Sequence, residues 1–199
     1  MKGATKYRSI ASLAPLLSLL LWNASCSNSL FKVSPASALP PLSAAAASAN
    51  VGVVTFRAAP LLTDEETQEL FESNLQLAGL LPVRLEVTHH GGDPIEVKKL
   101  KFGLHDASNS NWKLISAKSA ISRILKANDV FAYNPNSRKT FEKEFRAYEF
   151  DLKTPFTPAE AKRHGILIFQ TAKKEPVAYP KELTLTIEGL VQPVSLKLN

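Results

Sequence analysis

The chain contains very little cysteine, with Cys26 as the single example among 199 residues. One cysteine cannot form a disulfide within the chain, so a disulfide-stabilised scaffold is excluded. The sequence also lacks a glycine-rich phosphate-binding loop, a G-x-S-x-G nucleophile elbow and an H-E-x-x-H zinc motif. From these absences we expect a protein that is not an enzyme and that carries no cofactor.

Long hydrophobic runs are also missing, which excludes a protein with several membrane spans. The one strongly apolar segment lies in the uncharged stretch 9–30 and is densest over 13–22, after three basic residues. It is shorter than the roughly 20 apolar residues of a membrane-spanning helix. A basic start followed by a short apolar run is typical of a secretory signal. The sequence therefore predicts a signal peptide over residues 1–25.

The residues around Cys26 resemble the lipobox of bacterial lipoproteins. Two small residues, Ala24 and Ser25, precede the cysteine, although Asn23 stands where that pattern has an aliphatic residue. The resemblance implies cleavage before Cys26 and attachment of a lipid to its side chain. Two alternatives remain open, which are secretion after cleavage at the A-x-A pattern of 36–38 and an uncleaved N-terminal anchor.

Residues 26–50 are rich in Ser, Ala and Pro and contain one charge, Lys32. This composition predicts a disordered tether that leads into a folded domain over 51–199. The full chain has a formal net charge of +6, but all the acidic residues lie after residue 50, where 18 of them face 20 basic residues. The basicity therefore belongs mostly to the N-terminal segment, and we expect no nucleic-acid partner.

Short alternating apolar segments separated by turn residues dominate the domain, which predicts antiparallel β structure. Helical spacing and a Thr63 capping box predict two short helices, over 63–71 and 117–126. Residues 141–152 fit a helical start followed by a strand from about Ala147. The expected strands are 51–57, 81–87, 95–104, 112–115, 163–170, 182–188 and 194–198. This order favours an antiparallel immunoglobulin-like β-sandwich.

The segments 81–90 and 95–104 flank a Gly-Gly turn and predict an antiparallel hairpin whose first strand is buried on one face. One extra residue between Val97 and Leu100 breaks the alternation, which indicates a β-bulge at Lys98 and Lys99.

Two runs resemble a family of uncharacterised bacterial secreted proteins and lipoproteins with an immunoglobulin-like domain. They are the alternating strand Pro82–Val87 and the Thr157–Glu160 corner that precedes Gly165–Phe169. The resemblance covers roughly 51–198. It implies a β-sandwich and carries no known enzymatic activity.

Three lysines, Lys98, Lys99 and Lys101, are candidates for contact with an anionic surface. Lysines on a strand also protect its edge from aggregation, and this second interpretation stays open. Two aromatic residues, Trp112 and Tyr133, could line a binding surface, or could pack in the core.

Histidines supply the one metal-ligand pattern in the sequence, formed by His89, His90 and His105 with Asp106. Adjacent residues on a strand point to opposite faces, so His89 and His90 fit one ion poorly. We therefore expect no metal site.

Together these features predict a non-enzymatic module of the cell envelope that acts in protein interaction or structural support. Its expected partners are a membrane, through a lipid on Cys26, and an envelope protein or glycan. The alternatives are a soluble periplasmic or extracellular location, and an envelope protein that binds a small ligand or glycan, with residues 117–140 as one wall.

Overall fold

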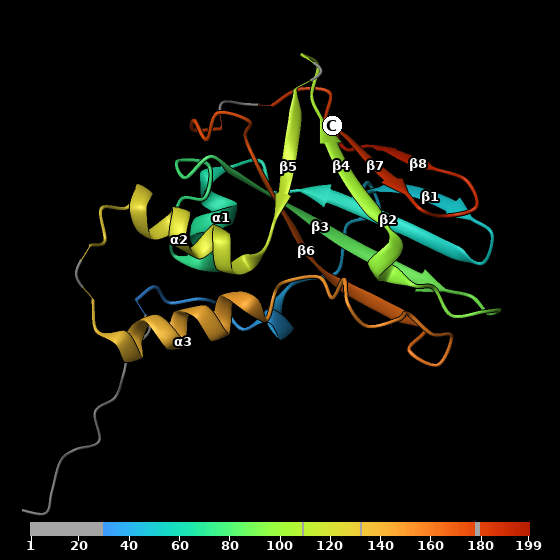
Figure 1. Cartoon of the computed structure of the whole chain (residues 1–199), viewed down its shortest axis with the longest axis horizontal. Helices are drawn as coiled ribbons and strands as arrows, with labels where there is room; N and C mark the ends of the chain where they lie inside the picture. The colour runs from blue at the N-terminus through green and yellow to red at the C-terminus, as the bar shows by residue number, and fades with distance from the viewer. Residues whose placement is uncertain (1–29, 109, 132, 178–179) are drawn as a thin grey trace, which may run out of the picture.

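The computed structural model describes residues 30–199 apart from Asn109, Ala132 and residues 178–179. Its strands form one eight-stranded sheet in the order β1-β2-β3-β6-β5-β4-β7-β8, and all neighbouring strands are antiparallel (Figure 1). The strands are β1 (Ala47–Val51), β2 (Val54–Pro60), β3 (Leu80–His89), β4 (Lys101–His105), β5 (Asn111–Ile115), β6 (Lys162–Gln170), β7 (Thr184–Glu188) and β8 (Val194–Lys197).

The sheet curls until its two edge strands, β1 and β8, lie against each other, so its shape approaches a barrel (Figure 1). This confirms the prediction of a mainly antiparallel β domain with few helices. The immunoglobulin-like sandwich is not confirmed, because the strands belong to a single continuous sheet. Strong curling accommodates many short strands without a second sheet, since it buries one face of the sheet against itself.

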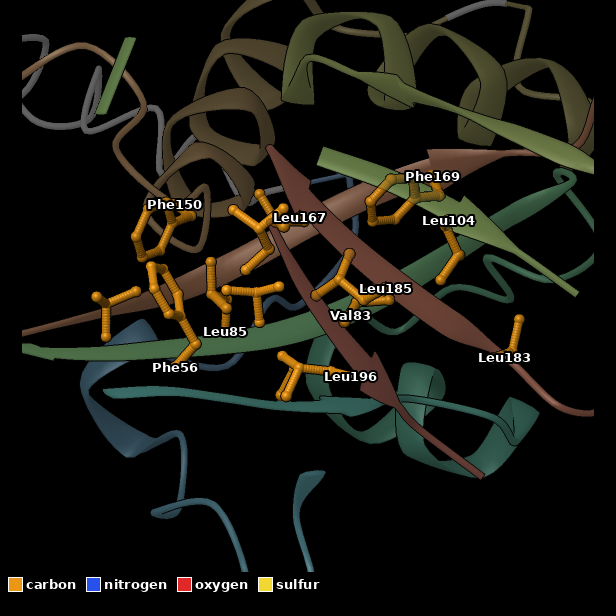
Figure 2. Close-up of a cluster of buried hydrophobic side chains, with 14 of the residues drawn as sticks. Phe56, Val83, Leu85, Leu104, Phe150, Leu167, Phe169, Leu183, Leu185 and Leu196 are labelled. Carbon is orange, nitrogen blue, oxygen red and sulfur yellow. The ribbon is translucent and has the colours of Figure 1, made fainter. Parts of the chain in front are cut away.

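The concave face of the sheet encloses the larger hydrophobic core, part of which Figure 2 shows. Alternate residues of each strand point into it, as the two-residue period of a strand requires. Two aromatic residues, Phe150 and Phe156, come from the loop before β6 and fill the same space. The fully buried members include Phe56, Leu81, Val83, Leu104, Phe169, Leu183, Leu185 and Ile187.

A second core lies between the convex face of the sheet and the helices α1 (Asp64–Phe71), α2 (Ala117–Ala127) and α3 (Pro135–Arg146). On β6, Leu167 and Phe169 belong to the first core, whereas Ile166 and Ile168 belong to the second. The strand predicted to be buried on one face, β3, is thus buried along both faces. The helical cover of the convex face, which strand alternation does not reveal, is the reason.

Both predicted helices are confirmed. In α1 the Thr63 hydroxyl accepts a hydrogen bond from the Glu66 backbone N–H, and the Glu66 carboxylate accepts one from the Thr63 N–H, which completes the capping box. In α2 the Ser116 hydroxyl caps the first turn. The third helix, α3, realises the helical start predicted near Phe141. The strand expected after it does not form. Glu149 makes only an isolated β-bridge in that segment.

The predicted hairpin of 81–90 with 95–104 is wrong. β3 pairs with β2 and β6, whereas β4 pairs with β5 and β7. The break in alternation that indicated a β-bulge is a short 3-10 helix, η2 (Val97–Lys99). β2 and β6 occupy the two edges of β3, so neither edge is left for β4. The chain therefore turns away from β3 before β4 begins.

Part of the Ser/Ala/Pro-rich segment belongs to the folded unit. It contains η1 (Ala36–Ala38) and β1, which pairs with β2 through the Gly52 turn. Val33 and Leu42 are buried against the domain. The ordered structure therefore begins earlier than the predicted boundary at residue 51, and the predicted strand over 51–57 covers the end of β1, the turn and the first half of β2.

Gly165 on β6 allows the loop before β6 to approach the strand closely. A Cβ atom at this position would lie 2.6 Å from the Phe150 Cα and 2.8 Å from the Phe150 backbone N, which is closer than real Cβ contacts. Backbone hydrogen bonds between Phe150 and Ile166, and between Ile166 and Tyr148, fix the approach. The loop cannot retreat without losing these bonds.

We expect Gly165→Ala to lower the free energy of unfolding by about 1–3 kcal/mol, because the added methyl group overpacks a buried site. Urea unfolding would measure the change. Ser195→Ala, at an exposed position of β8, is the control and should stay within about 0.5 kcal/mol of the original protein. Equal stability of the two variants would contradict the close approach.

Candidate functional site

A groove of about 700 Å³ lies where β5 leads into α2. β4 and β5 pair through only two residues each, Leu104 with Trp112 and His105 with Asn111, and the strands then diverge. The segment 148–150 takes the place beside β6 that β5 leaves. The groove therefore lies between the end of β5 and the loop 149–153.

The groove combines an apolar floor with a charged rim. Its apolar members include Leu114 and Leu152, which are half-buried, and Phe150, which is buried. Three basic and two acidic side chains surround them, namely Lys118, Arg146, Lys153, Glu149 and Asp151. Such a surface suits an extended, amphipathic ligand, since apolar area supplies affinity and charge supplies orientation.

Both acidic side chains of the rim are engaged with backbone N–H groups. The Glu149 carboxylate accepts a hydrogen bond of 2.8 Å from the Ala117 N–H at the start of α2. The Asp151 carboxylate accepts from the N–H groups of Lys153 and Thr154, and hydrogen bonds from Thr154 and Lys153 lower the pKa of Asp151. These hydrogen bonds fix both carboxylates in place at the rim and stabilise their ionised form.

Arg163, at the start of β6, holds the loop that forms one wall of the groove. Its guanidinium donates to the backbone carbonyls of Asp151, Thr154 and Pro155, and to the carboxylate of Glu160. These hydrogen bonds give partners to the N–H groups of a guanidinium that is almost fully buried. The hydrogen bonds that Arg163 donates to the Glu160 carboxylate raise the pKa of Arg163, so the guanidinium stays charged. The Thr157–Glu160 corner noted in the sequence thus serves to position Arg163.

A second charged cluster lies on the convex face of β2, β3 and β6. Glu86 is 2.8 Å from Lys162 Nζ and 3.2 Å from Arg57 Nη1, and its side chain is 8% exposed. Arg57 also donates to the carbonyls of Leu42 and Ser43, so the cluster attaches the N-terminal segment to the sheet. Burial alone would raise the pKa of Glu86, but the hydrogen bonds and charges of Lys162 and Arg57 outweigh it and lower the pKa.

We expect Glu86→Gln to lower the free energy of unfolding near neutral pH by about 1–3 kcal/mol, because two charge-assisted hydrogen bonds are lost. The folded-state pKa of Glu86 lies below the unfolded one, so its contribution is complete above the unfolded value of about 4.3 and is lost as the pH falls through the folded value. The difference between the two proteins should therefore shrink toward about pH 3.

Urea titrations at both pH values would measure this difference. Glu175→Gln, at an exposed position in the loop after β6, is the control and should change stability little at either pH. A difference for Glu86→Gln that does not depend on pH would contradict the assigned role.

The structure separates the candidate binding residues of the sequence. Lys98 and Lys99 lie in η2, where Lys98 pairs with Glu96, and Lys101 begins β4. All three are exposed, but they do not share a strand. Of the three lysines, only Lys101 lies on a strand edge without a partner, because the backbone of β4 does not pair with β5 at this residue. The interpretation that a lysine protects a strand edge from aggregation therefore applies to Lys101 alone.

Trp112 and Tyr133 do not form a common surface. Trp112 packs in the core inside the curled sheet and donates its indole N–H to Asp106. Tyr133 packs against the second core, on the helical side of the sheet, and its hydroxyl accepts from Arg138. The sheet lies between them, so they cannot line one pocket.

The histidines have structural contacts. The buried His89 ring bonds to the Asp93 carbonyl and the Gly91 N–H, and it lies against Phe156. His90 bonds to Thr55. Within the described residues no group of three His, Cys, Asp or Glu side chains could hold a metal ion.

Sequence reasoning missed the groove and both charged clusters. Glu86 occupies a polar position in an alternating strand, which indicates solvent exposure unless the cover by the N-terminal segment is known. Arg163 follows Glu160 by three residues, and this spacing is the one signal in the sequence that could have suggested their pairing. Cys26, the predicted lipidation site, lies outside the described residues.

Comparison with known proteins gives no relative for this chain. No family model, curated protein or solved structure matches it.

Proposed function

We propose that the protein is a non-enzymatic, lipid-anchored module of the cell envelope that binds another envelope component through its β domain. The order of features in the chain carries this proposal. The chain starts with basic residues and a short apolar run, and two small residues then precede the sole cysteine, Cys26. A β domain follows, and the structure describes the chain from Leu30 onward. The likeness to bacterial secreted proteins and lipoproteins with an immunoglobulin-like domain supports the same assignment.

The groove beside β5 is the surface on which we place the partner. β4 and β5 leave unpaired edges where they diverge, and an extended polypeptide can add to such an edge through its backbone. The half-buried Leu114 and Leu152 would contact alternate side chains of that segment.

A second candidate function is the binding of a small ligand or glycan. The volume of the groove, about 700 Å³, falls within the range of roughly 300–1,000 Å³ that is common for small-molecule sites. The groove is open along one side, which favours a chain-like ligand over a compact one.

Export is part of the proposal, with a soluble periplasmic or extracellular protein as the alternative. Among the described residues, no helix combines the length and the apolar character that crossing a membrane requires. In the lipid-anchored form, a lipid on Cys26 would attach the domain to the bilayer.

Replacement of Cys26 by Ser tests the anchor. We expect the variant to move from the membrane fraction to the soluble fraction of the producing cell, because the thiol that accepts the lipid is gone. Ser25→Ala, which keeps a small residue before the cysteine, is the matched control and should stay with the membrane. Unchanged fractionation of Cys26→Ser would refute lipid attachment at this site.

A photo-crosslinking amino acid at Lys153, on the rim of the groove, tests the binding surface. We expect a crosslinked product with an envelope component in living cells. The same product should be lost when Leu152→Asp places a charge on the apolar floor. Lys197 on β8 is the control position and should give no such product. An identical product from both positions would contradict binding in the groove.

A further inference from the structure

Three of the exposed side chains of α3 are basic. Lys139, Lys143 and Arg146 recur at intervals of four and three residues, which places them on one side of a helix. All three are exposed, while Phe141 and Phe145 point to the opposite side and are buried. This outward row of positive charge, which we call the α3 basic face, is therefore a distinct feature of the surface.

Glu142 and Glu144 offset part of the positive charge of α3, but among the described residues neither forms an ion pair with Lys139 or Lys143. Glu142 lies at the flank of the helix, where its carboxylate is 2.7 Å from Arg138 Nε and 3.6 Å from Arg146 Nη2. Arg138 is itself turned toward Tyr133 and lies over its ring. The Glu142 carboxylate thus pairs mainly with Arg138. No ion pair is found for Lys139 or Lys143 within the described part of the chain.

A large apolar side chain is exposed next to this helix. Phe131, in the linker from α2 to α3, has 77% of its surface exposed. An exposed aromatic ring is unfavourable in water, but it suits the boundary of a bilayer, where aromatic rings enter the lipid and basic side chains contact headgroups.

The predicted anchor is close, along the chain, to a segment that packs against α3. The described chain begins at Leu30, and the ring of the next residue, Phe31, packs against Phe141 of α3 at 5.0 Å between centroids. Figure 1 shows this start of the chain running beside α3. Cys26 precedes Leu30 by four residues, which span at most about 14 Å when fully extended. A lipid on Cys26 would therefore hold this end of the domain near the bilayer.

We propose that the α3 basic face and Phe131 dock the domain onto anionic lipid headgroups of the membrane that holds Cys26. The inference rests on the proposed lipid anchor, which brings α3 within reach of the bilayer. Each lysine or arginine near an anionic surface adds to the attraction, and this attraction weakens with salt. Docking would orient the domain with the groove beside β5 next to the docked face, because Arg146 belongs to both.

The full chain, reconstituted in vesicles of phosphatidylcholine with phosphatidylglycerol, provides the test. An amine-modifying reagent is added, and mass spectrometry measures the modification rate of each lysine. We expect Lys139 and Lys143 to react at least about 3-fold more slowly in these vesicles than in vesicles of phosphatidylcholine alone. High salt should restore their rates.

Lys98, Lys99 and Lys101 are internal controls in the same molecule, because Figure 1 places the start of β4 well away from α3. Their rates should not depend on the lipid. Phe131→Ser should reduce the protection of Lys139 and Lys143. Val191→Ser, at a residue that is 99% exposed between β7 and β8, should not.

Equal rates for Lys139 and Lys143 in the two kinds of vesicle would overturn the docking face. Protection that extends equally to Lys98, Lys99 and Lys101 would also overturn it, because the domain would then have no preferred orientation. These outcomes are separate from that of the anchor. Fractionation of Cys26→Ser reports on lipid attachment alone, whereas the lysine rates report on the orientation of a chain already held at the bilayer.

Discussion

The pairing of β3 with β6 is the interaction on which the rest of the structure depends. These two strands form the longest ladder of the sheet, from Leu80 with Gln170 to Thr88 with Lys162. They lie at its centre and bury apolar side chains on both faces. A central pair of this kind requires cover on each side. The curling of the sheet covers one face, and the helices with the N-terminal segment cover the other.

The loop before β6 links this core to the functional surface. Phe150 and Phe156 enter the curled sheet from the loop, and Arg163 ties the loop backbone to the start of β6. Gly165 allows the two backbones to come close. The same loop forms one wall of the groove, so the geometry of the proposed binding surface is set by core packing. Side chains at the rim can therefore vary without loss of the groove.

The N-terminal segment and α3 give the domain a defined base. Arg57 and Glu86 attach residues 42–43 to the sheet, and Phe31 packs against Phe141. The path from Cys26 into the domain is short as a result. With a short connection, the proposed lipid anchor would also orient the domain, because the surfaces near the attachment point would face the bilayer. In the proposed arrangement the groove for a partner and the α3 basic face adjoin at Arg146, which belongs to both.

Local signals in the sequence determined the helices and most strands. The capping box of Thr63 and Glu66 fixes α1, and the alternation of Leu183, Leu185 and Ile187 leads into β7, because these patterns depend on neighbours a few residues away. Cys26 and its apolar run are likewise local. Only the tertiary structure decided that β3 pairs with β6, that the strands form one curled sheet, and that Glu86 and Arg163 are buried with partners. Those outcomes depend on contacts between residues far apart in the chain, and local periodicity carries no information about them.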